Sequence, residues 1–127
     1  MRLLLDTQVY LWVLLGSRKL SQKARDLITN ASEVYVSAAS IWEASIKIST
    51  GKLSIQKEIL LEGITKSGFA ALPVQVEHAA RVAMLPNHHR DPFDRLLIAQ
   101  AILETLRLLT ADDFLSHYSE LVVQVHK

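Results

Sequence analysis

Apolar residues follow two spacings along this chain, and the two spacings alternate. Short runs that are apolar at nearly every position are typical of strands buried on both faces. Such runs predict strands at 2–5, 34–36, 70–74, 107–110 and 121–125. Between them, apolar residues recur three or four positions apart, which predicts helices. The helices are expected at 8–15, from 21 onward, and at 37–48, 56–67, 76–85, 94–106 and 112–117.

Turn-forming residues support these boundaries. Thr7 is expected to cap the first helix, and Gly16 to end it. Gly51 and Gly68 are expected to stop later helices. Strands that alternate with helices predict a mainly parallel sheet covered on both faces, which is a three-layer α/β/α architecture. No repeat or linker divides the chain, so residues 1–127 are interpreted as one domain.

Composition narrows the class of protein. Half of the 127 residues are hydrophobic and 21% are charged, which excludes a disordered chain and allows a real core. The chain has no cysteine, so it has neither disulfides nor thiolate metal sites, and a reducing cytoplasm is the expected location. Asp6 and Gln8 interrupt the apolar start, which argues against a signal peptide. The run 9–15 is too short to span a membrane.

Acidic residues stand at the ends and turns of the most apolar segments. A carboxylate beside such sequence is costly unless its charge is offset. Parallel strands collect ligands at their carboxyl ends, where the predicted elements place these acids. The simplest ligand that these acids could share is a hard divalent cation, which prefers oxygen ligands. The four candidates are Asp6, Glu43, Asp94 and Asp112.

Each acid also has a purely structural interpretation, which the sequence leaves open. An Asp at a strand-to-helix junction is often only a helix cap. Glu43 has Lys47 four residues later, a favourable surface pair. Asp91 and Asp113 are possible further ligands, but Asp91 is expected to shape the turn before a helix and Asp113 to lie in a first turn.

Neighbouring polar residues complete the candidate site. Thr7, Ser40 and Thr110 could orient carboxylates or a water molecule, or could serve as caps. Arg95 could contact a substrate phosphate or pair with a nearby Asp, and His89, in the polar segment 88–90, could contact phosphate or face solvent. Adjacent histidines rarely share one tetrahedral metal, so a zinc pair is disfavoured.

Other chemistries lack their motifs. The chain contains no phosphate-binding loop, dinucleotide-type glycine repeat, nucleophilic serine elbow or cysteine nucleophile. The net charge is +1, with fourteen Lys and Arg against thirteen Asp and Glu. If a metal neutralised four of the acids, the remaining surface would be basic and would suit a polyanion. The charge counts alone favour an ordinary mixed-charge surface.

At the level of motifs, the chain resembles the PIN-domain toxins called VapC. Nearly the whole chain contributes: the segments 5–7, 36–47, 51–53 and 110–112, and most specifically 85–101, which contains Asp-Pro-Phe-Asp-Arg. The resemblance implies a PIN fold, a homodimer, Mg²⁺- or Mn²⁺-dependent cleavage of RNA, and inhibition by a VapB-like antitoxin. Its acidic quartet falls on the same four acids. Two departures are Gln8, where Asn or His is common, and Ser119-Glu120 in place of a glycine.

The resulting hypothesis is a cytoplasmic endoribonuclease in which carboxylates hold Mg²⁺ or Mn²⁺ and a water molecule attacks an RNA phosphodiester. The alternative is a catalytically silent PIN-like module that binds RNA or protein. DNA as the substrate is a further alternative, because nothing in the sequence separates ribose from deoxyribose. A signalling receiver domain is disfavoured, since no Asp follows the strands at 34–36 and 70–74.

Overall fold

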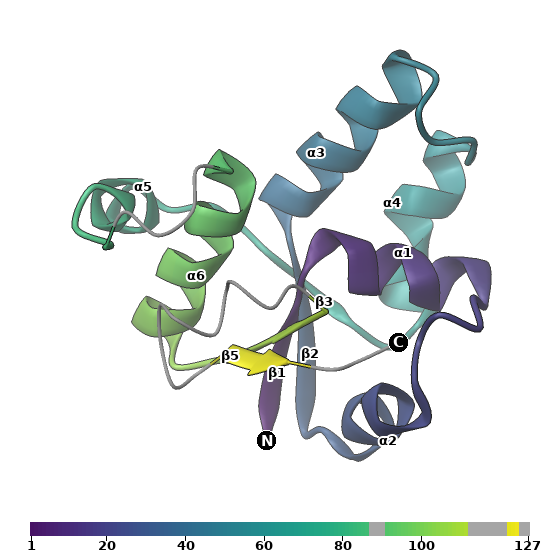
Figure 1. Ribbon diagram of the computed structural model, residues 1–127, viewed down its shortest axis with the longest axis horizontal. Helices are drawn as coiled ribbons and strands as arrows, with labels where there is room; N and C mark the ends of the chain where they lie inside the picture. The colour runs from purple at the N-terminus through teal and green to yellow at the C-terminus, as the bar shows by residue number, and fades with distance from the viewer. Residues whose placement is uncertain (87–90, 112–121, 125–127) are drawn as a thin grey trace.

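Five parallel strands form one sheet in the order β3-β2-β1-β4-β5 (Figure 1). This computed structural model describes residues 1–86, 91–111 and 122–124. Leu5 of β1 stands in register with Val36 of β2 on one side and with Leu109 of β4 on the other. The strands are β1 Arg2–Leu5, β2 Glu33–Ser37, β3 Ala70–Leu72, β4 Arg107–Thr110 and β5 Val122–Gln124.

Helices connect the strands from β1 to β4 and cover both faces of the sheet. In the described residues they are α1 Thr7–Leu15, α2 Gln22–Asn30, α3 Ala38–Ser49, α4 Lys57–Lys66, α5 Val76–Val82 and α6 Pro92–Glu104. Figure 1 shows α5 and α6 on one side of the sheet, with α1, α3 and α4 on the other. The predicted α/β/α architecture with a parallel sheet is therefore confirmed.

Alternate side chains of the central strand divide the core into two halves. Leu3 and Leu5 pack with α1 and the first helices, whereas Leu4 packs against α6. All three are fully buried. This explains why β1 is apolar without alternation: a strand buried on both faces has no solvent side.

Local capping departs from the sequence prediction at two helices. Asp6, not Thr7, caps α1, because its Oδ1 accepts a hydrogen bond from the Val9 amide at 2.7 Å. Helix α6 begins at Pro92, two residues before the predicted start, and Asp91 caps it as the proline enters the first turn. Gly16 ends α1 as expected, with φ +58°.

Several predicted elements correspond closely to observed ones. The expected strand at 70–74 is shortened to Ala70–Leu72, and the expected helix at 76–85 ends at Val82. The last predicted strand contains Val122–Gln124, whereas the predicted helix at 112–117 lies outside the described residues. Over the described ranges, no helix combines the length and apolar content that crossing a bilayer requires.

Candidate functional site

The carboxyl ends of β1 and β4 meet at the point where strand order reverses. The chain steps from β1 outward to β2 and β3, then returns to β4 on the other side of β1. This arrangement leaves a crevice at the strand ends, the usual ligand position in open parallel sheets. Asp6 follows β1 directly, and its backbone amide donates to the Leu109 carbonyl at 3.1 Å.

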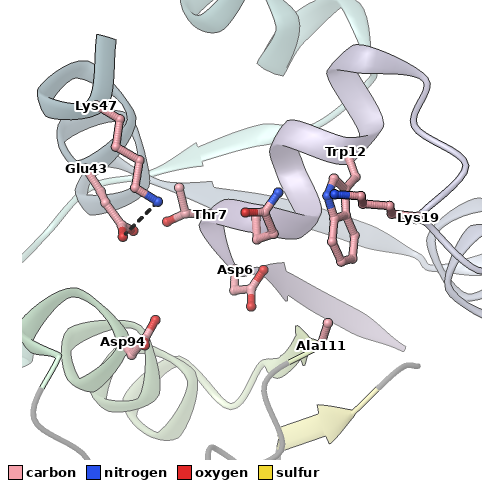
Figure 2. Close-up of a pocket in the computed structure, with 9 residues that line it drawn as sticks. Asp6, Thr7, Trp12, Lys19, Glu43, Lys47, Asp94 and Ala111 are labelled. Atoms are coloured by element: carbon pink, nitrogen blue, oxygen red, sulfur yellow. Dashed lines mark ion pairs between the residues drawn. The ribbon is translucent and has the colours of Figure 1, made fainter. Parts of the chain in front are cut away.

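A pocket of about 340 Å³ opens at this edge (Figure 2). Three of the predicted acids contribute to its wall from different elements: Asp6 from the β1 end, Glu43 from α3 and Asp94 from the first turn of α6. Figure 2 shows the three side chains around this pocket. The remaining lining residues are Thr7, Gln8, Trp12, Lys19, Lys47 and Ala111.

Asp6 is buried and held by two donors. The Val9 amide donates to Oδ1 at 2.7 Å, and the Thr110 hydroxyl donates to Oδ2 at 2.5 Å. Burial raises the pKa of Asp6 from 3.8 to about 6, the two hydrogen bonds oppose that rise, and the charges of Asp94 and Glu43 add to it. A nearby cation would stabilise the ionised form.

Glu43 lines the pocket, and one of its carboxylate oxygens has no partner in the described chain. Its Oε1 is buried and accepts no hydrogen bond within the described residues. Its Oε2 lies 3.7 Å from Nζ of Lys47, an ion pair longer than a hydrogen bond. The pairing that the sequence suggested therefore exists, but it faces the pocket rather than open solvent. A buried carboxylate oxygen of this kind is a candidate for an external ligand.

Asp94 and Asp91 have different positions although they are three residues apart. Asp91 Oδ1 accepts from the amides of Phe93 and Asp94 at 2.9 and 3.0 Å, which makes it the cap of α6. Asp94 lies one turn inside that cap and lines the pocket. The cap fixes the first turn of α6 and thereby the direction from which the Asp94 side chain approaches.

Three hydroxyl residues predicted for the site support its walls. Thr110 donates to Asp6, as above. Thr7 donates to Ser40 Oγ at 3.0 Å, a buried bond that joins the start of α1 to α3. Neither Thr7 nor Ser40 caps a helix, because Asp6 and Ser37 hold those positions. These bonds connect the elements that carry Asp6 and Glu43.

Some predicted residues do not reach the pocket or lie outside the described chain. Arg95 does not line it, since its guanidinium donates to the carbonyl oxygens of Val82 and Pro86 at 2.9 and 3.1 Å. Asp112, Asp113 and His89 lie outside the described residues. Ala111, immediately before Asp112, lines the pocket.

Sequence reasoning missed the two lysines of the pocket wall. Lys47 carried a usable signal, because it lies four residues after Glu43 on the same helical face. Lys19 carried no local signal; the segment between α1 and α2 brings it to the wall. Trp12 was likewise assigned no role, although it lines the pocket from α1.

The donor set is compatible with a hard divalent cation. Two aspartates and a glutamate offer oxygen ligands, and Glu43 Oε1 has no competing partner. Among the described residues, no three His, Asp or Glu side chains stand close enough to hold one ion as they are placed. Like charges in one pocket repel, so the metal-free arrangement is expected to keep these carboxylates apart.

Comparisons with known proteins agree with the fold. The family model described as PIN domain matches residues 3–121. VapBC2 from Rickettsia felis, solved bound to a DNA fragment from its promoter, superposes with a TM-score of 0.70 at 14% identity, covering 98% of both chains. A toxin–antitoxin complex from Klebsiella pneumoniae gives 0.68 at 18% identity, covering 95% of both. FitAcB from Neisseria gonorrhoeae gives 0.61 at 20% identity, covering 89% of both. No protein of curated function matches the sequence.

Proposed function

From the membership of this chain in the PIN domain family, we infer that it is an endoribonuclease. It hydrolyses RNA phosphodiester bonds with the help of Mg²⁺ or Mn²⁺. One observation carries the proposal. Asp6, Glu43 and Asp94, which are far apart in the sequence, face one pocket at the reversal point of the sheet. The family match from residue 3 to residue 121 supports treating the whole chain as one PIN domain.

Asp6, Glu43 and Asp94 would hold the metal, together with Asp112, which lies outside the described residues. When bound, a divalent ion acidifies a water molecule and withdraws charge from the phosphate. The chain's own contribution is positioning. Thr110 and Val9 fix both oxygens of Asp6, and the Thr7–Ser40 bond ties α1 to α3. The burial that raises the Asp6 pKa also excludes water that would weaken these electrostatic interactions.

The test is RNA cleavage by the purified chain in Mg²⁺, in Mn²⁺ and in EDTA. Asp6→Asn and Asp94→Asn should each lower the rate about 100- to 1000-fold, because they remove metal-holding charge. The matched control is Asp26→Asn, which changes an exposed acid on α2. Circular dichroism should show that all variants fold. Cleavage that persists in EDTA, or survives both site substitutions, would refute the nuclease proposal.

Metal titration separates the proposal from a silent PIN-like module. A metal that binds only the folded state stabilises it by about 2.7 kcal/mol at a concentration one hundred times Kd. Mg²⁺ should therefore raise the unfolding temperature of the chain, and Asp94→Asn should remove that rise. A silent module would show no such dependence on metal.

We further propose that the chain is the toxin of a VapBC-like pair and acts in the cytoplasm. The structural neighbours described as toxin–antitoxin complexes support this assignment. Induced expression should arrest growth, and co-expression of a small antitoxin encoded beside the gene should relieve the arrest. Asp94→Asn should be harmless. Growth that is unaffected by the active chain would contradict the toxin assignment.

A homodimer is the proposed assembly. Trp42 of α3 lines an apolar pocket together with Ala79 and Val82 of α5 and with Phe93 and Leu96 of α6. Trp42 is 61% exposed and meets Phe93 of α6 edge-on at 4.9 Å. A second copy covering this surface would remove apolar area from water. Trp42→Glu should shift the mass measured by light scattering from dimer to monomer; an unchanged mass would place the interface elsewhere.

A further inference from the structure

Two glutamate–lysine pairs in this chain have the same helical spacing and different geometry. On α4, Lys66 donates to Glu62 at 3.2 Å, and the two side chains are 76% and 60% exposed. On α3, Lys47 lies 3.7 Å from Glu43, whose side chain is only 15% exposed. The α4 pair is an ordinary surface pair of the kind that stabilises isolated helices. The α3 pair is more buried, yet it is not closed into a hydrogen bond.

Lys47 therefore keeps its hydrogen-bonding capacity at the pocket. An ammonium group has three donors, and within the described residues none of those of Lys47 makes a hydrogen bond. The ammonium shares the pocket wall with Asp6 and Asp94 (Figure 2). Its flexible stem and 40% exposure allow it to turn toward a ligand without moving the helix.

The positive charge of Lys47 opposes the binding of a metal ion to the same pocket. Glu43 Oε1 is buried without a partner in the described chain and is therefore a candidate metal ligand, whereas Oε2 faces the lysine. A divalent ion on Glu43 would repel the nearby ammonium, because two positive charges would then share one carboxylate. The anion available to accept the displaced ammonium would be the phosphodiester held at the same metal.

We propose that Lys47 binds a non-bridging phosphate oxygen of the RNA, a contact for which its ammonium would leave Glu43 if that carboxylate held a divalent ion. This inference rests on the proposed nuclease function and adds a substrate contact to it. The same residue then has two opposite effects. Its charge weakens metal binding, since it competes for Glu43, and it strengthens RNA binding, since it neutralises one phosphate.

The test compares Lys47→Met with the matched control Lys66→Met and with Lys47→Arg. RNA binding is measured with a fluorescently labelled single-stranded RNA of mixed sequence in Ca²⁺ and in EDTA, over a range of salt. Lys47→Met should weaken binding in Ca²⁺ about tenfold and reduce the slope of log K against log salt by about one. Lys47→Arg should retain that slope, and Lys66→Met should behave as the wild type.

Metal binding tests the other half of the inference, which is that Lys47 competes with a metal for Glu43. Lys47→Met should show a larger Mg²⁺-induced rise in unfolding temperature than the wild type, while its RNA binding falls. Under cleavage conditions it should raise KM about tenfold. Lys66→Met should change neither quantity.

The outcomes separate the inference from the nuclease proposal. Wild-type affinity and salt slope in Lys47→Met, or a smaller rise with Mg²⁺, would overturn the Lys47 contact and leave nuclease activity standing. A wild-type chain that binds RNA but never cleaves it would refute the nuclease proposal, and the binding comparison would still decide the contact. If Lys47→Met does not fold, Lys47→Gln is measured in its place, and wild-type affinity and salt slope in that variant would overturn the contact.

Discussion

The two ends of the central sheet differ in how their charged side chains are stabilised. At the amino end, Arg2 of β1 and Glu33 of β2 are partly exposed and pair at 3.1 Å, and the Arg2 guanidinium lies 5.8 Å from the centre of the Tyr35 ring. At the carboxyl end, Asp6 is buried, and the charges that act on it, those of Glu43 and Asp94, have its own sign.

The contrast is that Glu33 pairs with Arg2, whereas within the described residues no lysine or arginine pairs with Asp6. The Tyr35 hydroxyl donates to Glu33, and together with Arg2 it holds the pKa of Glu33 below its ordinary value. Burial raises the pKa of Asp6 instead. Strand β1 thus begins with Arg2, whose charge Glu33 of the neighbouring strand neutralises. It is followed by the buried carboxylate of Asp6, which a bound cation would stabilise. Function is expected at the second end, and variants of the two ends should differ accordingly.

The largest difference should follow from removing one glutamate at each end. Glu43→Gln should lower RNA cleavage about 100-fold or more, because a metal-holding charge disappears, whereas Glu33→Gln should leave the rate unchanged. Initial rates on one RNA preparation in Mg²⁺ measure both. Equal effects of the two substitutions would contradict the proposal that function lies at the carboxyl end of the sheet.

Protonation of Asp6, at the carboxyl end of the sheet, should change the stability of the protein when no metal is bound. The folded pKa of Asp6 is about 6 against an ordinary 3.8, so the folded state binds the proton more tightly than the unfolded state. The contribution of Asp6 to the free energy of unfolding should therefore be largest below about pH 4 and fall as pH rises through 6, by about 3 kcal/mol at most. Urea unfolding in EDTA measures this slope.

The variant Asp6→Asn isolates that contribution from the other titrating groups. The wild-type stability minus that of Asp6→Asn should decline across this pH window, and Glu33→Gln should retain the wild-type decline. With saturating Mg²⁺ the decline should shrink, because the ion favours the ionised carboxylate. A difference that stays flat with pH would contradict the raised pKa.

A smaller effect is expected when the donor to Asp6 is removed. Thr110→Val deletes the hydroxyl that donates to Asp6 Oδ2 at 2.5 Å and keeps the side-chain shape. Cleavage should fall about 10- to 100-fold, the range found when a partner of a metal ligand is lost. Tyr35→Phe, which removes a donor to Glu33 at the other end, should not change the rate.

The smallest effect should come from opening the exposed pair. Arg2→Ala removes the contacts with Glu33 and the Tyr35 ring, but partly exposed charges gain little from pairing in water. The unfolding temperature should shift by no more than about 3 °C, and cleavage should be unaffected. A thermal scan and a rate measurement suffice; a loss of activity here would mean that the amino end takes part in function.

Much of this architecture could be read from local sequence. Apolar runs without alternation marked β1 and β4 as strands buried on both faces, and Gly16 marked the end of α1. These features depend on a few neighbouring residues, because side-chain period and backbone φ act over one or two turns. Capping at α1 was predicted wrongly because Asp6 and Thr7 are both good caps, and sequence does not choose between adjacent candidates.

The sequence by itself determined the alternation of strands and helices and named the acids, since both follow from periodicity and residue type. Only the tertiary structure decided which of them meet. Asp6 and Thr110 are 104 positions apart and become neighbours because β4 pairs with β1. Tertiary packing also decided that Lys47 lines the pocket. It decided as well that Arg95 donates to the carbonyl oxygens of Val82 and Pro86 instead. Burial, which raises the Asp6 pKa, is a property of the packed layers and of no single segment.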